Sequence, residues 1–147
     1  MKSFKNRKAS HDYFIVQKIE AGIVLKGTEI KSIRAGKLNF KDSYAKIEHG
    51  ECWLFNFHIS PWENAAFFNH QAERKRKLLL HSNEIKRLKT KVDEQGMTLV
   101  PLEIYINDAG LCKLSLALAK GKKLHDKRES IQQRDLDRER DRNSEED

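Results

Sequence analysis

The run Arg74-Lys75-Arg76-Lys77, followed at once by Leu78-Leu79-Leu80, is the strongest candidate for binding chemistry in this chain. Four adjacent cations repel one another unless solvent or a polyanion screens them. The pattern predicts a clamp for RNA phosphates beside an apolar wall. The alternative is a solvated loop that leads into a buried strand. We favour the RNA interpretation because the charges and the leucines abut.

A second basic stretch runs from Lys120 to Arg128 and holds five cations and one anion. It follows an apolar segment and opens a hydrophilic tail. Gly121 permits a hinge, and the flat ring of His125 can stack on a nucleic-acid base. A disordered basic linker explains the same residues equally well.

Residues 20–36 mix charges with glycines. A glutamate in a groove, such as Glu20, accepts hydrogen bonds from the amino groups of guanine or cytosine. On the residues alone, ordinary turn and helix-surface chemistry is the better explanation of this segment.

Catalytic and metal-binding patterns are missing. The six His and two Cys show no ligand spacing, and Cys112 alternates with leucines as a core residue does. The sequence contains neither a nucleophile motif nor a glycine-rich phosphate loop. We therefore expect no enzyme activity, no metal and no cofactor.

The charge distribution divides the chain into a body and a tail. The formal net charge is +7, and residues 1–119 hold all of the excess, with 20 Lys and Arg against 13 Asp and Glu. A basic body favours a nucleic-acid partner. Residues 120–147 hold too little apolar surface to offset the entropy of ordering, so they predict a disordered tail. No signal peptide or membrane span is evident, which predicts a cytoplasmic protein with reduced thiols.

Hydrophobic periodicity predicts a mainly β, α+β fold. We expect a basic arm over residues 1–12, strands over 13–19 and 23–25 with a turn between them, and a short helix that begins at Thr28. A hairpin with His49-Gly50 at its turn, a loop over 62–77 and a helix from Ser82 to Gly96 follow. Two closing strands alternate apolar residues: Val100, Leu102, Ile104 and Ile106, then Cys112, Leu114, Leu116 and Leu118. Six short strands and two helices fit a small closed OB-like antiparallel β-barrel with flanking helices.

Several blocks in register resemble the SsrA-binding protein (small protein B) family. They span residues 6–128 in family order and comprise Asn6 with Ala9-x-His11-Asp12-Tyr13, the segment Glu20 to Gly36, Arg76-Lys77-Leu78-Leu79-Leu80, Gly96-x-Thr98-Leu99-Val100-Pro101, and Lys120 to Arg128. The resemblance implies an OB-like barrel that is not an enzyme. It also implies an adaptor that binds the tRNA-like domain of tmRNA and brings it, with elongation factor Tu, to stalled 70S ribosomes. We expect a monomer.

The resemblance and the basic blocks together give a predicted site. The predicted RNA-binding residues are Asn6, Lys8, His11, Glu20, Lys31, Arg34, Arg74, Lys75, Arg76, Lys77, Leu78, Leu79 and Leu80. The predicted ribosome-engaging tail, directed at the decoding region and the mRNA channel, comprises Lys120, Gly121, Lys122, Lys123, His125, Asp126, Lys127 and Arg128. The alternative function is a general OB-type chaperone for single-stranded RNA or rRNA.

Overall fold

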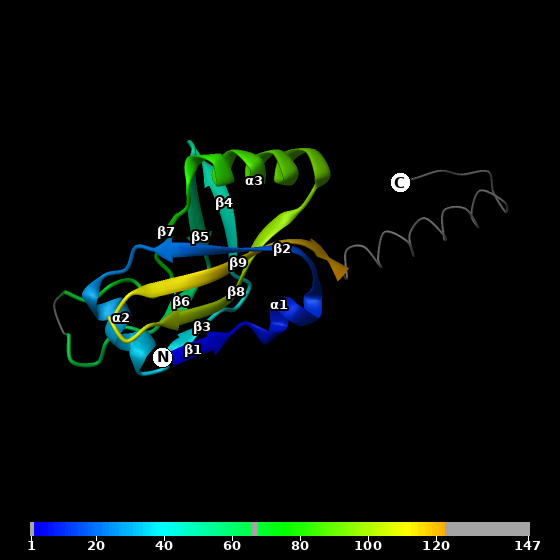
Figure 1. The fold of residues 1–147 in the computed structure, drawn as a ribbon. Helices are drawn as coiled ribbons and strands as arrows, with labels where there is room; N and C mark the ends of the chain where they lie inside the picture. The colour runs from blue at the N-terminus through cyan, green and yellow to red at the C-terminus, as the bar shows by residue number, and fades with distance from the viewer. Residues whose placement is uncertain (1, 66–67, 123–147) are drawn as a thin grey trace, which may run out of the picture.

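The structure is a computed structural model that describes residues 2–65 and 68–122. Its described part is mainly β, with helices on the outside of the sheet (Figure 1). The elements in chain order are β1 (Lys2–Lys5), α1 (Arg7–Asp12), β2 (Tyr13–Ile23), α2 (Gly27–Arg34), β3 (Leu38–Asn39), β4 (Tyr44–Glu48), β5 (Glu51–Phe55), β6 (His58–Ile59), β7 (Arg76–Leu79), α3 (Ser82–Gln95), β8 (Thr98–Ile106) and β9 (Cys112–Gly121). The predicted α+β class is confirmed.

One seven-stranded sheet, in the order β1-β8-β4-β5-β7-β2-β9, contains most of the strands, and β3 pairs with β6 separately. The pairings are antiparallel, and β8 also pairs with β9. The strand β8 therefore has β9 along one edge and both β1 and β4 along the other. In Figure 1, α3 lies across the top of these strands, while β1 and α1 lie at the bottom of the molecule.

Strand alternation buries the core as the sequence predicts for β9. Leu114, Leu116 and Leu118 are fully buried in the main core, and Cys112 packs against them from a partly exposed position. The prediction that Cys112 is a core residue is confirmed.

The prediction that the apolar residues of β8 lie on a single face is wrong. A register shift between Pro101 and Glu103 divides the strand. Ile104 and Ile106 face the main core, whereas Val100 and Leu102 pack with Ala9 of α1 in a second, smaller cluster. One extra residue in a bulge moves the following side chains to the other face.

The N-terminal segment, predicted as a flexible or surface-laid basic arm, is an ordered part of the sheet. The strand β1 pairs with β8 from Lys2↔Ile106 to Lys5↔Glu103, and α1 follows directly. Asn6 joins the two elements: its Oδ1 accepts a hydrogen bond from the Ala9 backbone N–H, and its Nδ2 donates to the Pro101 carbonyl at 2.8 Å. An asparagine at this position caps the helix.

Other local predictions have mixed outcomes. The hairpin is confirmed, and both His49 (φ 52°) and Gly50 (φ 75°) have the positive φ that a tight hairpin turn requires. The predicted turn over residues 20–22 is wrong, because β2 runs unbroken to Ile23 against β9. The helix α3 ends at Gly96 in the left-handed region, as predicted, and its N-cap is His81 rather than Ser82.

Candidate nucleic-acid interface

A hollow of about 420 Å³ brings together residues that lie far apart in the sequence. Glu20 and Gly22 come from β2, Leu79 and Leu80 from β7 and the residue after it, and Lys113 from β9. The register places Gly22 opposite Leu79, and a Cβ on Gly22 would lie only 3.2 Å from the Leu79 Cβ. Leu79 is 53% exposed, so an apolar wall faces solvent beside the carboxylates of Glu20 and Glu84 and the ammonium group of Lys113.

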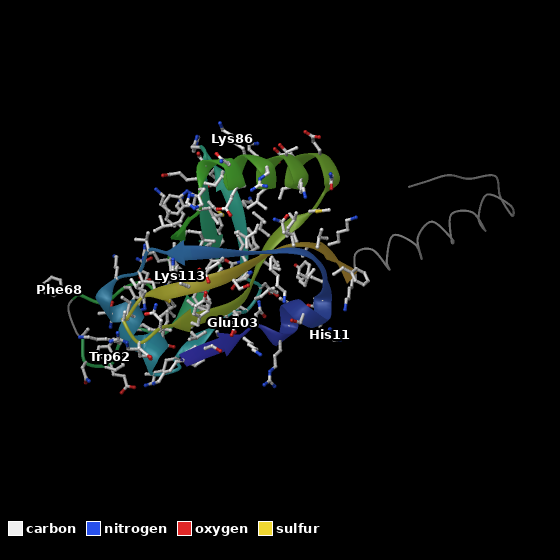
Figure 2. All side chains as sticks on the ribbon, viewed as in Figure 1. His11, Trp62, Phe68, Lys86, Glu103 and Lys113 are labelled. Carbon is white, nitrogen blue, oxygen red and sulfur yellow. The ribbon has the colours of Figure 1, made fainter. Side chains whose placement is uncertain are left out.

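Tyr105 holds the Glu20 carboxylate. Its hydroxyl donates a hydrogen bond to Glu20 Oε2 across the sheet from β8. This hydrogen bond, with smaller effects of burial and of the nearby carboxylates, raises the pKa of Tyr105 to about 12. Tyr105 carries no signal in the sequence, because only the pairing of β8 with β9 brings it near Glu20. Lys113 is labelled in Figure 2.

A larger hollow of about 670 Å³ lies between β1, the start of α1 and β3. Its lining includes the cations Lys5, Arg7, Lys8 and Lys41 and the aromatic ring of Phe4. Lys8 bonds the Asp42 carboxylate, and this hydrogen bond raises the pKa of Lys8. The concentration of cations makes this hollow a second candidate surface for phosphates.

The predicted N-terminal contact residues divide between surface and interior. Lys8 and His11 are exposed on α1, and His11 is labelled in Figure 2. Asn6 is a correction: it is 6% exposed, and its amide is engaged by the α1 cap and the Pro101 carbonyl. In this structure it positions α1 and offers no free amide to a ligand.

The predicted four-residue phosphate clamp is wrong for Arg76. The Arg76 guanidinium is fully buried and donates to Glu29 Oε2 at 2.6 Å, to the Phe57 carbonyl at 2.6 Å and to the Ala72 carbonyl at 3.0 Å. Arg74 donates to Glu29 as well, at 2.6 Å from Nη2. Leu78 is a second correction, because it is 1% exposed and belongs to the main core.

Glu29 is the fully buried acid that holds these two arginines. Burial acts to raise its pKa, but the hydrogen bonds from Arg74, the Lys26 backbone N–H and Arg76 outweigh burial, so the pKa of Glu29 is lowered. The anion is retained because its partners offset its desolvation. Sequence reasoning missed Glu29, which stands within a helix and three positions from its own N-cap.

The remaining predicted residues lie on other parts of the surface. Lys75 and Lys77 pair with Glu48 (3.7 Å) and Glu51 (2.5 Å). Lys31 and Arg34 are exposed on α2, and Arg34 lines a small hollow with Lys2 and Phe4. The structure therefore brings Glu20, Leu79 and Leu80 together and leaves the α1 and α2 cations on separate surfaces.

The first residues of the predicted tail belong to the sheet. β9 runs to Gly121, which pairs with Tyr13, so Gly121 is a strand residue rather than a hinge in the described structure. The Lys122 ammonium lies 5.1 Å from the centre of the Phe14 ring, within cation–π range. Lys123, His125, Asp126, Lys127 and Arg128 lie outside the described residues.

Across residues 2–65 and 68–122, no three His, Cys, Asp or Glu side chains are grouped to hold a metal ion. Over the same ranges, no helix has both the length and the apolar character needed to cross a membrane.

A mainly antiparallel sheet with a cation-rich hollow beside its N-terminal strand is typical of small nucleic-acid-binding domains. The SmpB protein family matches residues 3–146, and the chain belongs to that family.

Individual relatives agree. The SsrA-binding protein of Desulforudis audaxviator is 57% identical over 135 residues, which cover 92% of this chain and 88% of the relative. That of Acetivibrio thermocellus is 58% identical over 138 residues, 94% of this chain and 89% of the relative. A solved structure described as "tmRNA-SmpB: a journey to the center of the bacterial ribosome" is similar with a TM-score of 0.70 and 52% identity, and covers 82% of this chain and 84% of its own.

Proposed function

We propose that this chain binds the tRNA-like domain of tmRNA and delivers it to stalled ribosomes for trans-translation. The observation that carries the proposal is the identity of 57% to an SsrA-binding protein over nearly the whole chain. The function is that of a binding adaptor without catalysis, and it operates in the cytoplasm, where ribosomes work.

The hollow lined by Glu20, Leu79, Leu80 and Lys113 is the proposed centre of the tmRNA contact. A carboxylate accepts hydrogen bonds from base amino groups, an exposed leucine packs on a base or ribose, and an ammonium group pairs with a phosphate. The cations around the larger hollow, with Lys8 and His11, supply further backbone contacts.

The strand pairings support an OB-like barrel as the frame of this surface. Passing from β8 through β4, β5, β7, β2 and β9 leads back to β8. We propose that this circuit is a closed barrel, which would hold the side chains of β2, β7 and β9 in fixed relative positions.

The segment after Gly121 is the proposed ribosome-engaging part. Its basic start, Lys122 to Arg128, fits entry into an rRNA-lined channel, with elongation factor Tu on the charged tmRNA as the accompanying partner. We propose Gly121, the last residue of β9, as the boundary between body and tail, two residues beyond the boundary that composition predicts.

A titration tests the proposal. The pure chain is titrated against the tRNA-like domain of tmRNA and against an ordinary tRNA, at two salt concentrations. We expect clear preference for the tRNA-like domain and weaker binding at higher salt. Equal binding to both RNAs would refute the adaptor function and favour a general RNA chaperone.

Two variants locate the contact. Glu20→Ala should weaken binding to the tRNA-like domain without lowering the urea midpoint, because the Glu20 side chain is exposed. Lys86→Ala, on the outer side of α3 in Figure 2, is the control and should bind as the parent does. If Glu20→Ala binds the tRNA-like domain with unchanged affinity, the hollow is not part of the tmRNA contact.

A further inference from the structure

The outer face of β4, β5 and β7 has an unusual composition. Strand alternation directs Cys52, Leu54 and Leu78 into the core, where they are at most 1% exposed. The alternate residues therefore lie on the outer face, and they include three partly exposed aromatic rings and three lysines. These residues are Tyr44, Lys46, Trp53, Phe55, Lys75 and Lys77, and we call them the aromatic–lysine face.

The rings of this face are arranged side by side. Tyr44 and Phe55 occupy opposite positions in the β4–β5 pair and stack with ring centres 5.5 Å apart and planes 18° from parallel. Trp53 is two residues from Phe55 on the same strand, and its strand partners are Lys46 and Lys77. A row of three rings on a rigid sheet is the surface on which unpaired bases stack.

The lysines stand over the rings. The Lys75 ammonium lies 4.6 Å from the centre of the Trp53 ring and 6.0 Å from that of Phe55, and the Lys46 ammonium lies 6.0 Å from that of Tyr44. The acids of the same face, Glu48 and Glu51, engage Lys75 at 3.7 Å and Lys77 at 2.5 Å. Three cations against two anions leave the face positive, and Lys46 has no ion pair among the described residues.

We infer that the aromatic–lysine face is a binding site for single-stranded RNA, in which unpaired bases stack on Trp53 and Phe55 while the lysines pair with the phosphates. The commitment to RNA follows from the charge. The face carries one more cation than anion, and an apolar partner would cover the Lys46 ammonium group without a counterion, whereas a phosphate backbone pairs with it. Double-stranded RNA hides the faces of its bases, so it cannot use the rings.

The position of the face connects it to the proposed tmRNA contact. Lys77 and Leu79 are two residues apart on β7 and point to the same side, and Leu79 lines the hollow that contains Glu20. This connection to the hollow rests on the proposed function; the binding of single-stranded RNA to the aromatic–lysine face does not. An RNA held there would run across β7 with its unpaired nucleotides over Trp53.

Fluorescence reports on the site directly, because the chain has only two tryptophans, Trp53 and Trp62. A Trp62→Phe background leaves Trp53 as the single reporter. The probe is an oligouridylate of about ten nucleotides, within the range of OB-fold site sizes. The control ligand is a duplex RNA of the same length. We expect the oligouridylate to quench Trp53 emission and the duplex to leave it unchanged.

Variants measure the contributions of the ring and of the charge. Binding of a labelled oligouridylate to the full chain is measured by fluorescence anisotropy. Trp53→Ala should weaken this binding about tenfold or more, and Trp53→Phe should retain most of the affinity. Lys75→Ala should lower the slope of log K against log salt by about 0.7, the value for one phosphate of a single strand. Lys86→Ala, a control for loss of a surface lysine, should lower it less.

The outcomes separate the two proposals. If Trp53→Ala loses oligouridylate binding and Glu20→Ala keeps it, the result supports the aromatic–lysine face. This holds whatever the affinity of either variant for the tRNA-like domain. Oligouridylate binding that leaves Trp53 emission unchanged and is equal in Trp53→Ala, Lys75→Ala and the parent overturns it. If Trp53→Ala does not fold, Lys75→Ala decides, because the Lys75 side chain is 51% exposed and its loss leaves the core intact.

Discussion

Removing the Glu29 carboxylate should destabilise the fold far more than removing a surface charge. Glu29 is fully buried and accepts hydrogen bonds from Arg76 Nε and Arg74 Nη2, both at 2.6 Å, and from the Lys26 backbone N–H at 2.7 Å. In Glu29→Ala, the equally buried Arg76 keeps its two carbonyl acceptors and loses its counterion. An uncompensated buried charge costs about 3–5 kcal/mol.

That free energy is a large part of the stability of a small domain, which is about 5–15 kcal/mol in total. It corresponds to a fall in Tm of roughly 10–20 °C for a chain of this size. The assay is urea unfolding followed by far-UV circular dichroism at neutral pH. The control is Lys89→Ala, which removes an exposed i,i+4 pair with Asp93 (2.6 Å) and should cost no more than about 0.5 kcal/mol. A cost for Glu29→Ala as small as that of the control would refute the reasoning.

The pH dependence gives an independent check. The pKa of Glu29 in the folded state lies below its ordinary value of 4.5. A carboxyl whose pKa is lowered by folding contributes its stability above the unfolded-state pKa, and that contribution is lost as the pH falls through the folded-state pKa. The difference in stability between the parent and Glu29→Gln, which cannot titrate, should therefore narrow as the pH falls below 4.5. If the difference in stability between the two proteins stays constant until acid unfolds them, the assignment of Glu29 as a buried anion is wrong.

Three further predictions follow from other parts of the structure. Tyr105→Phe should weaken binding to the tRNA-like domain roughly two- to tenfold at an unchanged urea midpoint, because a lost hydrogen bond frees the Glu20 carboxylate; equal affinity in a matched titration would contradict this. Burial raises the pKa of Cys52 and of Cys112 to about 12, so iodoacetamide at pH near 8 should modify neither in the native protein and both in urea, as mass spectrometry will report. A chain that ends at Gly121 should bind the tRNA-like domain like the parent and fail in a tagging assay with stalled ribosomes; normal tagging would refute the role given to the tail.

Residue patterns predicted the elements that depend on local chemistry. The His49-Gly50 hairpin and the end of α3 at Gly96 need a positive φ at one or two positions, and the residue types at those positions predict it. The alternation of Leu114, Leu116 and Leu118 likewise predicts a strand with one buried face.

The elements that sequence reasoning missed depend on partners far along the chain. The strand β1 is basic and short, and it forms because β8 offers an unpaired edge about 100 positions away in the sequence. The glycine in residues 20–22 suggests a turn, yet the chain stays extended there because β9 pairs with it throughout. Tertiary pairing overrides local propensity in both cases.

The candidate site was only partly predictable, because some of its residues come together through strand pairing alone. The resemblance to SsrA-binding proteins named Glu20 and the leucines of β7, and the structure places Glu20, Leu79 and Leu80 in one hollow. Tyr105 could not be found from the sequence, because only the sheet brings its hydroxyl to Glu20. Asn6 was assigned to the RNA surface although its position before α1 matches a helix cap.

The basic run at residues 74–77 shows how a strand changes the meaning of a charge pattern. Successive side chains of an extended segment point to opposite faces, so four adjacent cations separate into two pairs. Arg74 and Arg76 turn inward to one buried acid, Glu29, and serve the fold. Lys75 and Lys77 turn outward beside the Trp53 ring, where they pair with the surface acids Glu48 and Glu51. The fold therefore relieves the repulsion within the run on one side, and on the other side only the two lysines are proposed RNA contacts. It follows that replacing the arginines would weaken RNA binding through unfolding, whereas replacing the lysines would weaken it at constant stability.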